Sequence, residues 1–123
     1  MLSMKNYRLA VDENGSPFVL NSKGSIDFGY ITEEMNLPAA PIRVAEGLSG
    51  PKGYGLKHIV EGHEKEILNA GYDSVYDFIE DVANDFTVIK EGKSGSFLLE
   101  KGDAYHNTLF VALSREGDYW KVV

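Results

Sequence analysis

Four β-rich runs in the last third of the chain constrain the fold more than any other feature. The runs cover residues 87–90, 96–101, 107–114 and 119–123, with glycine-containing breaks at residues 92–95, 102–103 and 116–118. Connections this short join antiparallel neighbours, because a parallel crossover needs a dozen or more residues. The sequence therefore predicts a four-stranded antiparallel meander.

Two helices are expected just before the meander. In residues 56–70 the apolar positions recur at helical spacing, and Gly71 follows as a typical C-terminal stop. The second helix spans residues 74–86, with Asp73 or Ser74 as its cap and Asp77 in the position of an acidic capping box. Its apolar stripe comprises Val75, Phe78, Ile79, Val82 and Phe86. Two helices packed on one face of an antiparallel meander make an α+β domain.

The first third of the chain is expected to be mostly extended. Residues 6–11 and 18–21 are predicted as short strands around an Asn14-Gly15 turn. Residues 25–31 form a third extended piece, Pro38 and Pro41 favour extended backbone, and residues 42–45 are a short apolar stretch. Residues 46–55 contain four glycines and a proline and are expected to be a loop. We therefore divide the chain into a β-hairpin extension, residues 1–24, and a main domain, residues 25–123, within one compact unit.

Composition excludes several kinds of site. The chain has 123 residues and no cysteine, which excludes disulfides, thiolate metal sites and a cysteine nucleophile. No apolar stretch approaches the roughly 20 residues needed to span a membrane, and the first six residues contain no signal-peptide core. These features fit a cytoplasmic protein. The net charge of −7 disfavours binding of nucleic acid by bulk charge, so an RNA ligand would require a locally positive cleft.

His58 and His63 are the main candidates for chemistry, because imidazole is the usual proton carrier near neutral pH. Five residues correspond to about 140° around a helix, so the two rings do not share one narrow face. His63 falls on the apolar stripe and is interpreted either as a catalytic partner or as a hydrogen-bonded core histidine. His58 lies off the stripe and is interpreted either as an exposed catalytic group or as a solvated surface residue.

Gly62 lies one turn after His58 on the same side of the helix. A glycine inside a helix costs about 1 kcal/mol relative to alanine. Close approach by a ligand or a strand beside His58 would explain it, and so would tight packing of the helix on the sheet. The spacing of His58 and His63 is not that of a zinc-protease helix, so no metal site is expected.

A second group of polar side chains lies near the C-terminal end: Ser114, Arg115, Tyr119 and Lys121. Tyr119 and Lys121 share a face by strand alternation. A cation can stabilise the negative charge of a phosphoryl group, and a hydroxyl can bind it by a hydrogen bond. The same residues also fit an ordinary polar hairpin. His106 is expected at the solvent face of a strand, and Trp120 in the core.

Several segments together resemble a phage-associated branch of the barnase/EndoU/colicin tRNase/RelE-like (BECR) nucleases. They are Ser25-Ile-Asp-Phe-Gly29, Ala40-Pro-Ile-Arg43 with Glu46-Gly47, Gly55-Leu-Lys-His-Ile-x3-His63-x3-Ile67, and Gly71-Tyr-x-Ser-x3-Phe78. The resemblance covers residues 25–123, and the histidine segment is its most specific part. It implies a core of two helices followed by a four-stranded antiparallel sheet.

The resemblance also implies a toxin-like endoribonuclease that needs no metal ion or other cofactor. In that chemistry a ribose 2′-hydroxyl attacks the adjacent phosphate and yields a 2′,3′-cyclic phosphate and a 5′-hydroxyl. The implied catalytic groups are His58, His63 and Lys121; the implied substrate-binding groups are Lys57, Ser114, Arg115 and Tyr119. RNA, including tRNA, is the implied partner, with a protein inhibitor or a larger phage polyprotein as further context and no membrane. The negative net charge favours a different interpretation. In it, the chain is a catalytically inactive binding module of a phage or mobile element with the same fold.

Overall fold

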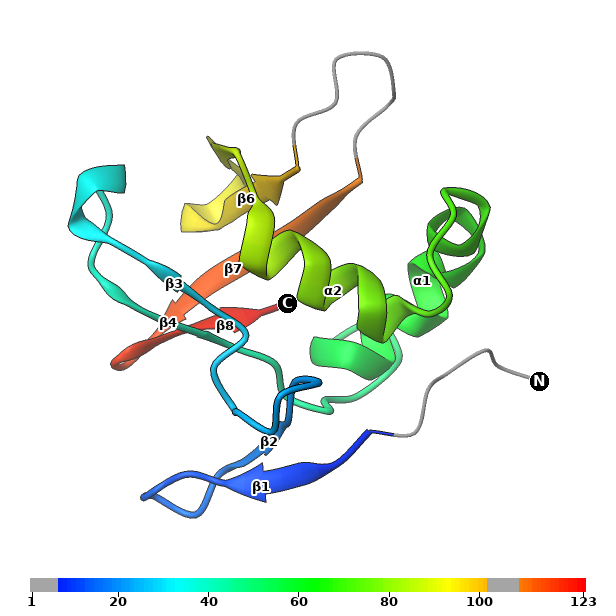
Figure 1. Cartoon of the computed structure of the whole chain (residues 1–123), viewed down its shortest axis with the longest axis horizontal. Helices are drawn as coiled ribbons and strands as arrows, with labels where there is room; N and C mark the ends of the chain where they lie inside the picture. The colour runs from blue at the N-terminus through cyan, green and yellow to red at the C-terminus, as the bar shows by residue number, and fades with distance from the viewer. Residues whose placement is uncertain (1–6, 102–108) are drawn as a thin grey trace.

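A computed structural model describes residues 7–101 and 109–123 as two α-helices, two short 3₁₀ turns and eight strands (Figure 1). In chain order the elements are β1 (Leu9–Val11), β2 (Pro17–Val19), β3 (Gly29–Ile31), η1 (Glu33–Met35), β4 (Ala40–Arg43), α1 (Gly55–Asn69), α2 (Val75–Asp85), β5 (Val88–Glu91), η2 (Lys93–Gly95), β6 (Phe97–Glu100), β7 (Phe110–Glu116) and β8 (Tyr119–Val122). The α+β class is confirmed. His106 and the first two residues of the predicted strand 107–114 lie outside the described residues.

The prediction of a four-stranded antiparallel meander was wrong. The main sheet has six strands in the order β3-β4-β8-β7-β6-β5, and it is mixed because β4 runs parallel to β8. Strands β5 to β8 do pair as consecutive antiparallel neighbours. The connection from β4 to β8 passes through both helices and three strands. Short loops fix only the pairing of sequence neighbours, so they carried no information about the addition of β3 and β4 beside β8.

Both predicted helices are confirmed, and their ends have the expected chemistry. The Ser74 hydroxyl accepts a hydrogen bond of 3.1 Å from the backbone N–H of Asp77 and so caps α2. Gly71, with φ +106°, follows the end of α1 in a conformation that favours glycine. These local signals placed both helix boundaries to within about one residue.

The core lies between α2 and one face of the six-stranded sheet, with α1 beside α2 (Figure 1). Gly29 on β3 permits this packing, because an added Cβ would lie 2.1 Å from the carbonyl oxygen of Ala83 in α2. The fully buried side chains of the sheet share that face: Ile31, Ile42, Leu99, Val111, Leu113, Trp120 and Val122. We call the opposite side of the sheet the open face. By strand register, Tyr30, Phe110, Ala112, Ser114, Tyr119 and Lys121 project from it.

The N-terminal hairpin of β1 and β2 contributes Val19 to the core, and its Phe18 ring contacts Tyr119 on the open face of the sheet. Val19 is fully buried, and its N–H donates a 2.7 Å hydrogen bond to the Val44 carbonyl. The guanidinium carbon of Arg43 lies 5.7 Å from the Phe18 ring centroid and 5.5 Å from the Tyr119 centroid, which joins hairpin and sheet. The described residues include no helix of the length and apolarity that crossing a membrane requires.

Candidate functional site

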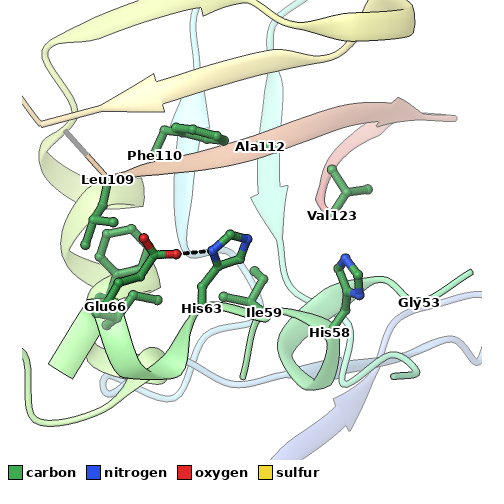
Figure 2. A pocket seen from close by; sticks show the side chains of 11 residues that line it. Gly53, His58, Ile59, His63, Glu66, Leu109, Phe110, Ala112 and Val123 are labelled. Atoms are coloured by element: carbon green, nitrogen blue, oxygen red, sulfur yellow. Dashed lines mark hydrogen bonds and ion pairs between the residues drawn. The ribbon is translucent and has the colours of Figure 1, made fainter. Parts of the chain in front are cut away.

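The two histidines of α1 line one cavity of about 400 Å³ between α1, β7 and the end of β8 (Figure 2). Ile59 and Phe78 contribute apolar surface from the helices, and Phe110, Ala112 and Val123 contribute it from the strands. Residues five apart in a helix are separated by about 7.5 Å along its axis. The cavity follows α1 over that distance, and both rings therefore face it although they point in different directions around the helix.

His58 is half-buried rather than exposed, which corrects the expectation from its position off the apolar stripe. Its Nδ1 atom is buried and has no hydrogen-bond partner among the described residues. The imidazole packs against the backbone of Gly53, where an added Cβ would lie 2.7 Å from Nδ1. The other ring nitrogen points into the cavity (Figure 2). The missing side chain at Gly53 thus leaves room for this ring.

His63 is exposed, with 56% of its side chain accessible, although it lies on the apolar stripe of α1. Ile59 and Ile67, one turn to either side, are buried. Between them the stripe borders the cavity, so neither α2 nor the sheet covers the His63 ring. Periodicity indicates the direction of a side chain but not what lies opposite it. The interpretation of His63 as a core histidine was therefore wrong.

Glu66 is a site residue that the sequence reasoning missed. Its carboxylate is hydrogen-bonded to Nδ1 of His63 and lines the same cavity (Figure 2). Residues three apart in a helix are surface neighbours, so the spacing of His63 and Glu66 could have predicted their contact from sequence. When Nδ1–H donates to the carboxylate, the neutral ring keeps its lone pair on Nε2. The pair His63–Glu66 is thus a histidine with a fixed tautomer and an accessible accepting nitrogen.

Gly62 is not explained by the packing of a strand or of the sheet against α1. Outside the backbone of its own helix, no atom lies within 4 Å of the position that its Cβ would occupy, so neither a strand nor the sheet packs against it. Gly62 borders a separate shallow surface on the outer side of α1, together with Lys57 and Lys65. The glycine that makes room for His58 is Gly53, which precedes the helix.

Lys121 and Tyr119 line a different groove, between β8 and the N-terminal hairpin. The Lys121 ammonium lies 3.5 Å from the Glu116 carboxylate and 5.0 Å from the centroid of the Tyr54 ring. Burial, followed by the charges of Glu116 and Asp12, raises the pKa of Tyr119, so its hydroxyl stays protonated at neutral pH. Both residues nevertheless project from the open face, as does Val123, which lines the histidine cavity. Alternate residues of a strand are about 6.6–6.8 Å apart, so Lys121 lies one such step from the cavity.

The remaining predicted substrate-binding residues are dispersed. Ser114 lies directly across from Lys121 on the open face. Arg115 is paired with Trp120 and therefore projects from the opposite side of the sheet, where its Nε donates to the Gly117 carbonyl at 3.0 Å. Lys57 is exposed on the outer side of α1, 3.8 Å from Glu46. Arg115 and Lys57 are therefore not among the residues that line the histidine cavity.

The charge around the cavity differs from the expected positive cleft. None of its lining residues in the described parts of the chain is Lys or Arg, and Glu66 is the acidic one. Among the described residues that line the cavity, the two imidazoles are the only potential cations. Within residues 7–101 and 109–123, no three His, Asp or Glu side chains are grouped as they would be to hold a metal ion.

Comparisons of the chain with models of protein families, with curated proteins and with solved structures gave no match. The resemblance to the BECR nucleases therefore stays a prediction from short sequence segments.

Proposed function

We propose that the chain is an endoribonuclease that cleaves RNA by acid–base catalysis at the cavity of His58 and His63. The observation that carries this proposal is the placement of two imidazoles in one cavity, one of them hydrogen-bonded to the Glu66 carboxylate. Cleavage by the adjacent 2′-hydroxyl needs one proton acceptor and one proton donor on either side of a phosphate. The resemblance to BECR nucleases supports the same chemistry.

His63 is the proposed base. Its Nε2 accepts the proton of a ribose 2′-hydroxyl while that oxygen forms a bond to phosphorus. The Glu66 carboxylate stabilises the imidazolium that results, as an acidic partner does in a catalytic triad. His63 is preferred over His58 for this step, because only His63 has a carboxylate on its Nδ1 atom.

His58 is the proposed acid. In its protonated form it donates a proton to the 5′-oxygen as the bond between phosphorus and that oxygen breaks. The products are a 2′,3′-cyclic phosphate and a 5′-hydroxyl. The positive charge of the His58 ring also offsets charge on the phosphate, which matters in a cavity without Lys or Arg among its described lining residues.

Lys121, Ser114 and Tyr119 are proposed to bind the neighbouring part of the RNA strand along the open face. Lys121 is the third proposed catalytic group, since a flexible four-carbon stem lets its ammonium leave Glu116 for a phosphate. Arg115 and Lys57 are left out because they project elsewhere. We further propose a cytoplasmic RNA such as tRNA as substrate and, by analogy with toxin-like nucleases, a protein inhibitor or a larger phage protein as partner.

The proposal is tested by incubating the protein with bulk tRNA in EDTA. We expect RNA fragments, and a loss of roughly 10²- to 10⁴-fold in rate for His58→Ala and for His63→Ala. Tyr30→Ala is the control, because Tyr30 is exposed on β3 at the far edge of the sheet. Absence of cleavage by the wild type, or equal cleavage by the histidine variants, would overturn the proposal.

A non-catalytic binding module is the second candidate. The acidic composition and the lack of Lys and Arg among the described residues of the cavity favour it. This function predicts binding of a partner without any cleavage in the same assay. It also predicts that substitution of either histidine leaves the RNA intact, as in the wild type.

A further inference from the structure

Phe110 is an exposed aromatic side chain at the histidine cavity. Half of it, 49%, is accessible, and it projects from the first residue of β7. Single exposed apolar residues are common on protein surfaces, so exposure alone has no meaning. Its position is informative: of the large exposed apolar side chains in the described chain, only Phe110 also lines the cavity of His58 and His63.

The cavity has two chemically different walls (Figure 2). Phe110 and Ala112 on β7, together with Leu109 just before that strand, form an apolar wall. His58, His63 and Glu66 form the proton-transferring wall on α1, across the cavity from the Phe110 ring. The volume of about 400 Å³ is within the range of sites for small organic ligands.

A nucleotide has the same division into two parts. Its base is planar and stacks on aromatic rings, whereas its ribose and phosphate carry the groups that an acid and a base act upon. A base against Phe110 would direct its ribose toward the opposite wall. Stacking on an aromatic face needs no positive charge. It can therefore supply affinity for RNA in a cavity that has no Lys or Arg among its described lining residues.

We propose that Phe110 is the stacking surface for the nucleobase adjacent to the cleaved phosphate, and that this contact replaces a basic patch as the main source of substrate affinity. The proposal rests on the endoribonuclease function proposed above. It predicts recognition of a single-stranded RNA segment, because a paired base does not expose its face. It also predicts little selectivity among the four bases, since every base has a face that stacks.

Titration with nucleoside 5′-monophosphates, followed by protein NMR, tests this binding separately from cleavage. AMP, GMP, CMP and UMP are compared with ribose 5-phosphate, which lacks a base. We expect all four nucleotides to shift amide signals of β7 and α1, and ribose 5-phosphate to bind at least about tenfold more weakly. Equal binding of ribose 5-phosphate would overturn the proposal.

Three substitutions separate stacking from general apolar contact. Phe110→Ala should weaken nucleotide binding roughly 5- to 150-fold, Phe110→Leu should weaken it nearly as much, and Phe110→Trp should preserve it. The spectrum of each free variant shows whether it is folded, and the Trp variant keeps the test valid if the smaller side chains disturb β7. Tyr30→Ala is the matched control for loss of an exposed aromatic ring. Unchanged affinity in Phe110→Ala, or full affinity in Phe110→Leu, would contradict the role of the ring.

The outcomes of this test and of the cleavage assay are independent. Stacking that depends on Phe110, without RNA cleavage, would support the nucleobase site and reject the nuclease. Cleavage that depends on the histidines, with nucleotide binding unaffected by Phe110→Ala, would support the nuclease and reject the nucleobase site.

Discussion

His63 and Glu66 are joined by a hydrogen bond from Nδ1 to the carboxylate, and both side chains remain about half accessible at the cavity. The bond fixes the imidazole tautomer and leaves Nε2 free toward the cavity. A solvated histidine on an otherwise apolar stripe thus has one defined accepting atom. This relationship makes His63, rather than His58, the proposed base.

Glu66→Gln should lower kcat at least about tenfold and leave KM nearly unchanged. The amide still accepts a hydrogen bond from Nδ1 but has no charge to stabilise the imidazolium formed in the reaction. Steady-state cleavage of a fluorogenic RNA checks this, with Glu34→Gln on the exposed 3₁₀ turn η1 as control. A rise in KM at constant kcat would instead assign Glu66 to substrate binding.

Gly53→Ala and Gly62→Ala form a matched pair of glycine substitutions. At Gly53 the new methyl group would lie 2.4 Å from the Leu48 carbonyl and 2.7 Å from Nδ1 of His58, so both must shift. We expect a loss of about 1–3 kcal/mol in the free energy of unfolding, together with reduced cleavage.

At Gly62 the methyl group meets no atom within 4 Å outside the backbone of its own helix, and alanine favours the helix. The free energy of unfolding should therefore rise by about 0.5–1 kcal/mol with cleavage unchanged. Urea denaturation measures both variants. Stabilisation by Gly53→Ala would contradict the packing of His58 against this glycine.

Lys121→Ala should reduce cleavage if its ammonium moves from Glu116 to a phosphate of the bound strand. The control is Lys90→Ala, because Lys90 also projects from the open face and is also paired with an acid, Glu100, at 3.2 Å, but belongs to β5. A loss of about tenfold or more in kcat/KM for Lys121→Ala alone is expected. Equally small losses in both variants would show that Lys121 does not contact the RNA and only lines the groove beside the hairpin.

Asp81 gives a prediction on stability rather than activity. Burial alone would raise the pKa of its carboxyl, but hydrogen bonds from Lys101 at 2.8 Å and Tyr72 at 2.6 Å outweigh it, and the pKa is lowered. A lowered folded-state pKa means that the stabilisation is present above the unfolded value of about 3.9 and is lost as the pH falls through the folded pKa.

Asp81→Asn should therefore lower the free energy of unfolding by about 1 kcal/mol at pH 7, and the difference from the wild type should shrink in acid. Thermal denaturation across pH checks this, with Glu91→Gln on the exposed part of β5 as control. A difference that stays constant down to pH 2 would show that the carboxylate charge is not responsible.

The helices could be predicted from sequence because their signals are local. The stripe of α2, the Ser74 cap and Gly71 each act within a few residues. The place of β3 and β4 in the sheet could not, because strands of three and four residues carry no clear alternation and β4 pairs with β8 across most of the chain.

The sequence predicted only part of the candidate site, because local signals do not show which elements lie opposite a helix. The sequence identified both histidines, but their exposure depends on which elements lie opposite α1. Periodicity left His63 as either a catalytic partner or a core residue, and the structure places it at a cavity. Phe110 was not recognised because its significance comes only from a distant neighbour, His63, across that cavity.

The central claim is tested most directly by the products formed from a defined single-stranded RNA in EDTA. The comparison uses an oligonucleotide of the same sequence with a methyl group on every 2′-oxygen. The account predicts that the unmodified RNA is cut to 2′,3′-cyclic phosphate and 5′-hydroxyl ends, that His58→Ala and His63→Ala lose this activity, and that the methylated RNA stays intact. No cleavage of the unmodified RNA, or cleavage of the methylated one, would contradict it.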